Sequence, residues 1–246
     1  MALKDEFERQ GNWLFCNRSW LPLILLTLLV VFYAARIMFQ DYIEIPEPDD
    51  SWELICLIIS LTGLVVRIFT IGLAAKRTSG RDTEGQIADS LNTKGIYSIV
   101  RHPLYLGNFL MWLGLAMMTM DIEFVAIFIL LYWLYYERIM FAEEQFLHRK
   151  FGKVYEEWAA STPAFIPAFR KFKKADTSFN WRKVLRNEKN GFCALMLLFA
   201  VLHVANSLTW HEMDIDEEWI FAAGASILVY IVLKVLKKSS LLSDPV

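Results

Sequence analysis

Two stretches of the sequence, residues 93–107 and 143–167, carry opposite charges beside tyrosine rings. Their charged and aromatic side chains are Arg101, His102, Tyr97, Tyr105, Glu143 and Glu144. A guanidinium binds a carboxylate and a carboxylate binds an ammonium group, so the two stretches together suit a ligand with an amino-acid end. Tyrosine rings add a flat surface for adenine and a negative face for a sulfonium. S-adenosylmethionine has all of these parts.

Six apolar runs, each close to the ~20 residues that cross a bilayer core, separate the polar stretches. Apolar residues make up 56% of the 246-residue chain. The runs are Trp20–Phe39, Trp52–Ala75, Pro103–Met120, Phe124–Phe141, Gly191–Leu208 and Trp219–Leu236. The sequence therefore predicts an all-α, polytopic membrane protein with about six transmembrane helices, and it excludes a soluble domain.

The placement of charge predicts the orientation of these helices. Outside the apolar runs, Lys and Arg occur in residues 1–19, 76–102 and 138–189 and in the C-terminal tail, whereas the loops between carry only acidic charges. Because cytoplasmic loops are enriched in Lys and Arg, we expect both termini and both charged stretches to be cytoplasmic.

The third and fourth runs form a predicted hairpin, since only a few residues separate them. The cytoplasmic ends of its helices should then be neighbours, which brings Arg101 close to Glu143. Pro103 suits the first position of a helix. We also expect free backbone N–H groups at that helix start to attract an anion.

Three polar segments flank the predicted hairpin. Residues 76–92 are expected to form a cytoplasmic loop, which is either a lid or a plain connector. Residues 147–158 predict one amphipathic helix, which either lies in the cytoplasmic interface or folds back on the helix bundle. Its apolar face consists of Leu147, Phe151, Val154, Tyr155 and Trp158. The basic residues of 169–189 either attract anionic lipid headgroups or only set the topology.

Taken jointly, these motifs resemble the isoprenylcysteine carboxyl methyltransferase and phospholipid methyltransferase group of membrane enzymes. The resemblance covers roughly residues 89–167, about a third of the chain. The matching positions are Gly95, Tyr97, Arg101, His102, Pro103, Tyr105, Gly107, Glu143, Glu144, Phe151, Gly152, Tyr155 and Pro167. The combination of positions is specific, whereas the Arg-His-Pro triplet alone is weak.

The resemblance implies a cofactor, S-adenosylmethionine, bound on the cytoplasmic side. The cofactor contacts it implies are Tyr97, His102, Pro103, Leu104, Tyr105 and Glu143, with Asp89, Ser90, Leu91 and Asn92 from the segment before the first glycine.

Four charged side chains are candidates for binding and activating the methyl acceptor. Prenylcysteine-specific members of the group carry an arginine where this chain has Ile139; its nearest arginine, Arg138, is one place earlier, or about 100° away around a helix. The acceptor is therefore left open. We expect Arg101 or Arg138 to hold an anionic acceptor, and Glu144 to act as the base toward an amine. Arg67, a charge inside the second run, either lines the site or pairs with a neighbouring helix.

The leading hypothesis is an integral membrane S-adenosylmethionine-dependent methyltransferase that acts on a lipid or other lipophilic acceptor: a carboxylate, phosphate, amine or thiol. The alternatives are an NADPH-dependent membrane reductase of the sterol-reductase type and a non-enzymatic membrane scaffold.

We expect no metal site and no nucleic-acid partner, since no zinc-binding or phosphate-cradling motif occurs. His203 is expected to be a hydrogen-bonded structural residue. The predicted divisions are residues 1–88, a methyltransferase core at 89–167, and residues 168–246.

Overall fold

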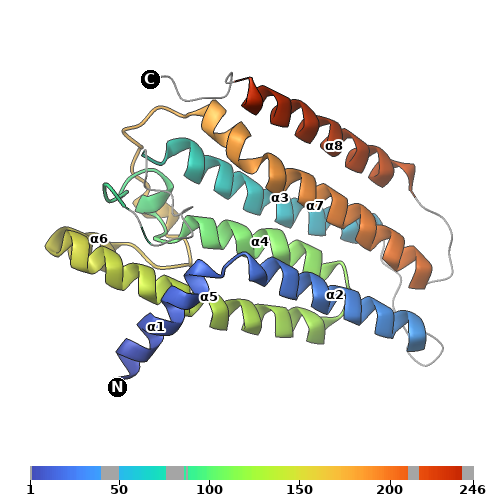
Figure 1. Cartoon of the computed structure of the whole chain (residues 1–246), viewed down its shortest axis with the longest axis horizontal. Helices are drawn as coiled ribbons and strands as arrows, with labels where there is room; N and C mark the ends of the chain where they lie inside the picture. The colour runs from blue at the N-terminus through green and yellow to red at the C-terminus, as the bar shows by residue number, and fades with distance from the viewer. Residues whose placement is uncertain (1, 40–49, 76–85, 87, 210–215, 240–246) are drawn as a thin grey trace. The chain divides into compact units, whose positions relative to one another are not determined.

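The computed structural model describes residues 2–39, 50–75, 86, 88–209 and 216–239 (Figure 1). Within these ranges the chain forms α-helices and short 3-10 turns and no strand. The α-helices are α1 (Leu3–Cys16), α2 (Trp20–Phe39), α3 (Asp50–Leu73), α4 (Pro103–Met117), α5 (Ile122–Phe151), α6 (Lys153–Ser161), α7 (Trp181–Thr209) and α8 (Glu217–Lys238).

Each predicted apolar run lies wholly or mostly in a helix, which confirms the all-α polytopic class. Five helices, α2, α3, α5, α7 and α8, are long and apolar enough to cross a membrane. The sixth, α4, has only 15 residues. At 1.5 Å per residue it is about 22 Å long, shorter than the ~30 Å of a bilayer core.

The described residues cluster into two compact units, each built from three separate segments. The first unit comprises the described residues of Met1–Leu21, Val66–Gly107 and Ile129–Asn180. The second comprises those of Pro22–Val65, Asn108–Phe128 and Trp181–Val246. The predicted divisions of the chain stay predictions, because the spatial units run across them.

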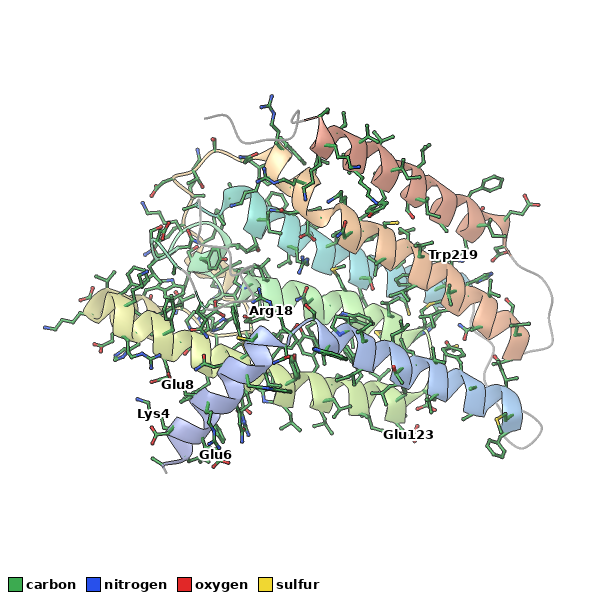
Figure 2. All side chains as sticks on the ribbon, in the orientation of Figure 1. Lys4, Glu6, Glu8, Arg18, Glu123 and Trp219 are labelled. Carbon is green, nitrogen blue, oxygen red and sulfur yellow. The ribbon has the colours of Figure 1, made fainter. Side chains whose placement is uncertain are left out.

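The second unit has a packed apolar core with satisfied polar groups inside it. The core residues are Leu29, Tyr33, Cys56, Leu115, Met118, Leu195, Phe199 and Leu202. Trp219, at the start of α8, stacks on Phe199 of α7, and the two helices run side by side (Figures 1 and 2). His203 is buried, and its Nδ1 lies 3.0 Å from a carboxylate oxygen of Glu53. The prediction of a hydrogen-bonded structural histidine is therefore confirmed.

The first unit differs from the prediction at the end of α5. The single amphipathic helix predicted for residues 147–158 is wrong: α5 continues to Phe151, and Gly152 then breaks the helix with a φ of +52°. Glycine suits this left-handed conformation because it has no Cβ. The break turns Val154 outward, where it is 62% exposed, while Tyr155 of α6 stays buried.

The second unit offers a direct test of its helix packing. A Cβ at Gly114 of α4 would overlap Ser60 Oγ and the carbonyl oxygen of Cys56 on α3. We predict that Gly114→Ala lowers the stability of the protein by about 1–3 kcal/mol, because overpacking forces the helices apart. The measurement is the thermal unfolding midpoint in detergent.

Gly224→Ala is the matched control for that substitution, since nothing lies within 4 Å of a Cβ at this exposed position of α8. Its midpoint should stay the same or rise slightly, because alanine is the better helix former. Equal midpoints for the two variants would contradict the close approach of α3 and α4.

Candidate functional site

One pocket in the first unit brings the two predicted stretches together. Roughly 760 Å³ of space lies within it, counting its open mouth and the solvent there. Every predicted cofactor residue except Asp89 lines it: Ser90, Leu91, Asn92, Tyr97, His102, Pro103, Leu104, Tyr105 and Glu143. Residues 76–85 and 87 of the predicted lid lie outside the described residues.

A buried imidazole joins the two helix ends at this pocket. His102, directly before α4, places its Nδ1 3.5 Å from Glu143 Oε2 and its Nε2 2.9 Å from Glu144 Oε1. Adjacent residues of a helix point about 100° apart, so the two ring nitrogens reach two different carboxylates of α5. On its other side the ring stacks on Tyr105, with centroids 5.6 Å apart.

The carboxylates keep this imidazole charged. Burial alone lowers the pKa of His102, but hydrogen bonds to Glu143 and Glu144 and their negative charges outweigh it and raise the pKa from 6.5 to about 9. His102 is therefore an imidazolium at neutral pH, with both N–H groups donating. Burial also raises the pKa of Tyr97, as does the charge of Glu143. Tyr97 therefore stays a neutral hydroxyl.

The segment after α6 fixes the backbone that leads into α4. The N–H groups of Arg101 and His102 donate to the carbonyls of Pro163 and Ala164, at 2.9 and 3.1 Å. The prediction that these groups are free to bind an anion is therefore wrong for these two residues. Trp158 Nε1 also donates to the Tyr97 carbonyl, at 3.0 Å. These contacts set the position of His102 without using its side chain.

The two predicted catalytic residues pair with each other. Arg101 Nε lies 3.2 Å from Glu144 Oε1, an ion pair without hydrogen-bond geometry. Arg101 lines the pocket, but Glu144 is not among the lining residues. A carboxylate between two cations holds its charge strongly and is a weak base. The geometry therefore favours Glu144 as the anchor of Arg101 and His102.

The two predicted acceptor-binding arginines do not line the pocket. Arg138 pairs with Glu137 at 3.0 Å, and its guanidinium lies 3.5 Å from the centroid of the Phe7 ring. Ile139, beside it, is fully buried. Arg67 is partly buried and interacts with Tyr132.

Several pocket residues were missed by sequence reasoning. They are Phe15, Gln86, Ala88, Phe146, Leu147 and Trp158. Leu147 and Trp158 were assigned to the apolar face of the predicted amphipathic helix, with no contact to the pocket specified. Phe15 belongs to α1, a helix that was not predicted. The signal was present, since Leu3, Phe7, Leu14 and Phe15 follow helical spacing.

The pocket lining combines charged side chains with aromatic and aliphatic ones. The lining residues Arg101, His102 and Glu143, together with Glu144, which pairs with both cations, sum to zero charge. This balance suits a zwitterionic ligand better than a polyanion, and the aromatic and aliphatic side chains suit a flat, weakly polar group. Among the residues that the structure describes, no group of three or more His, Cys, Asp or Glu side chains is placed to hold a metal ion.

Comparison with known protein families gives a match over the middle of the chain. The model of the phospholipid methyltransferase family matches residues 52–154. Residues 52–154, which are less than half of the chain, are thus similar to the phospholipid methyltransferase family. The resemblance inferred from the motifs is therefore confirmed, and the family segment contains both Arg101–His102 and Glu143–Glu144.

Curated relatives of this phospholipid methyltransferase segment carry two kinds of name. The nickel-cobalt-cadmium resistance protein NccN of Alcaligenes xylosoxydans xylosoxydans is 34% identical over 131 residues, 52% of this chain and 58% of that protein. A probable protein-S-isoprenylcysteine O-methyltransferase of Oryza sativa subsp. indica is 30% identical over 128 residues, 50% of this chain and 65% of that protein. The protein-S-isoprenylcysteine O-methyltransferase of Schizosaccharomyces pombe is 36% identical over 77 residues, 31% of this chain and 33% of that protein.

The chain thus spans less than two thirds of the length of these relatives. No solved structure is significantly similar to it.

The charged state of His102 predicts how stability depends on pH. Its pKa is raised in the folded protein, so the stabilisation is complete below about pH 6.5 and is lost as pH rises through about 9. We predict that the advantage of wild type over His102→Gln in unfolding free energy is larger near pH 6 than near pH 10, by up to about 3 kcal/mol. Thermal unfolding of both proteins across this range measures it. A difference that does not change with pH would contradict the imidazolium.

Proposed function

We propose that this chain is an integral membrane methyltransferase that uses S-adenosylmethionine and methylates a lipid or other lipophilic acceptor. The observation that supports the proposal is the pocket lined by His102 and Glu143, two residues that lie in the segment similar to the phospholipid methyltransferase family. The proposal includes a cytoplasmic site and cytoplasmic termini, as the distribution of Lys and Arg predicts.

The donor set of the pocket fits this cofactor. Glu143 would bind the ammonium group, because Glu144 is already engaged by Arg101 and His102. Arg101 would meet the carboxylate of the amino-acid end, and the Tyr97 hydroxyl would donate to it. Asn92 and Ser90 offer hydrogen bonds to a ribose or a base. The bound cofactor would supply an activated methyl group on its sulfonium.

The remaining residues position the acceptor and exclude water. Glu144, held by two cations, is a poor candidate for taking a proton from an amine. We therefore favour an acceptor that is already nucleophilic, such as a carboxylate, a phosphate or a thiolate. Such an acceptor needs alignment rather than a base, and alignment can contribute roughly 7–11 kcal/mol to lowering the barrier.

Binding of S-adenosylhomocysteine, the demethylated product, tests the proposal. Wild type should bind it saturably in detergent, and Glu143→Gln should weaken binding roughly 10–100-fold, since a charged hydrogen bond contributes about 1.5–3 kcal/mol. Isothermal titration calorimetry measures both constants. The control is Glu157→Gln, an exposed carboxylate of α6 outside this pocket, which should bind like wild type.

The alternatives give different results in the same experiment. Binding of NADPH in place of S-adenosylhomocysteine would favour a reductase, although Glu143 in the pocket wall would repel a pyrophosphate. Binding of neither ligand would favour a scaffold. A second readout is transfer of labelled methyl from S-adenosylmethionine to extractable lipid, which Glu143→Gln should reduce and Glu157→Gln should not.

A further inference from the structure

The N-terminal helix α1 lies outside the segment that matches the family, yet it contributes to the pocket. Phe15, near the end of α1, is 2% exposed and lines the pocket with Tyr97 and His102. Arg18 lies over the Phe15 ring, 4.2 Å from its centroid, and fixes it from another direction. Part of the pocket lining therefore comes from an element that the family match does not include.

The docking of α1 on α5 is close and specific. A Cβ at Gly11 would overlap the carbonyl oxygen of Arg138, so the two helices meet backbone to backbone there. Phe7 packs edge-on against Phe141, with centroids 6.0 Å apart, and carries the Arg138 guanidinium on its face. Glu8, labelled in Figure 2, forms an ion pair with Arg149 of α5.

The C-terminal half of α1 contacts two other parts of the first unit. The Tyr135 hydroxyl of α5 donates to the carbonyl of Leu14, at 3.3 Å. Gln86, which lines the pocket as Ala88 and residues 90–92 do, donates from Nε2 to Asn12 Oδ1, at 3.4 Å. Helix α1 thus contacts both α5 and a pocket residue that precedes Ala88 in the chain.

We propose that α1 is a working part of the cofactor site, with Phe15 as a cofactor-contacting residue and Arg138 as the residue that docks α1. This proposal rests on the proposed function, because its ligand is the cofactor. It gives Arg138 a role that differs from the acceptor binding expected of it. Phe7 and Glu137 engage its guanidinium, and neither residue lines the pocket.

The affinity of the protein for S-adenosylhomocysteine distinguishes the two roles considered for Arg138, which are docking of α1 and binding of the methyl acceptor. We expect Phe15→Ala and Arg138→Ala each to raise the dissociation constant of S-adenosylhomocysteine about tenfold or more, because each removes or displaces a buried apolar wall. Gly11→Leu should do the same by undocking α1 without altering any pocket residue. Phe15→Leu should recover most of the affinity. Trp13→Ala, at a position 66% exposed on the same helix, is the control and should match wild type.

Thermodynamic reciprocity supplies a second measurement. If docking of α1 increases the affinity for the ligand by some factor, then ligand binding must shift the docking equilibrium of α1 toward the docked state by the same factor. Saturating S-adenosylhomocysteine should therefore slow cleavage of wild type by trypsin after Arg9, which is exposed on α1. Without ligand, Gly11→Leu should be cleaved faster than wild type.

The outcomes separate this inference from the proposed function. If wild type does not bind S-adenosylhomocysteine, both fall. If wild type binds it but Phe15→Ala, Arg138→Ala and Gly11→Leu bind equally well, α1 is no part of the site, and the proposed function stands. If only Arg138→Ala keeps full affinity, the docking role of Arg138 is overturned.

Discussion

The arrangement of the first unit depends on His102 being charged and held between Glu143 and Glu144. A buried imidazolium is stable only when its charge is compensated, and removing one partner of a buried ion pair is strongly destabilising. The carboxylates come from α5 and the imidazole from the start of α4, so the pairing also fixes the two helix ends against each other. The ionic contacts of His102 with Glu143 and Glu144 offset the desolvation free energy that burying these charged groups requires.

Glu143 and Glu144 differ in the contacts that their carboxylates make. Glu144 has the shorter contact with His102 and also pairs with Arg101, whereas Glu143 has one longer contact with His102 and lines the pocket. In the proposed site, Glu144 therefore anchors Arg101 and His102, and Glu143 would bind the ligand. The sequence shows two adjacent glutamates and does not distinguish them, because the difference arises only once Arg101 has taken its position.

Much of the fold was predictable, because an apolar run near 20 residues has few alternatives in a membrane. The pocket was also largely predictable, since His102 and Glu143 come from the ends of a short hairpin. What sequence reasoning missed depends on tertiary contacts. The carbonyls of Pro163 and Ala164 accept hydrogen bonds from the N–H groups of Arg101 and His102. The acceptors follow the donors by about 60 residues in the chain, so sequence patterns near Arg101 give no sign of them. A single glycine, Gly152, breaks a pattern that otherwise looks continuous.

The family segment does not account for the whole pocket. Phe15 precedes residues 52–154 and Trp158 follows them, and both line the pocket. Residues outside the segment therefore contribute to a pocket whose charged lining residues, Arg101, His102 and Glu143, lie within it.

The most direct test of the central claim is an experimental structure of the protein with S-adenosylhomocysteine. Ligand density should lie among Tyr97, His102 and Glu143, with the ammonium group at Glu143 and with the His102–Glu144 contact retained. Density at another place, or a bound structure in which His102 and Glu143 do not touch the same molecule, would contradict the claim.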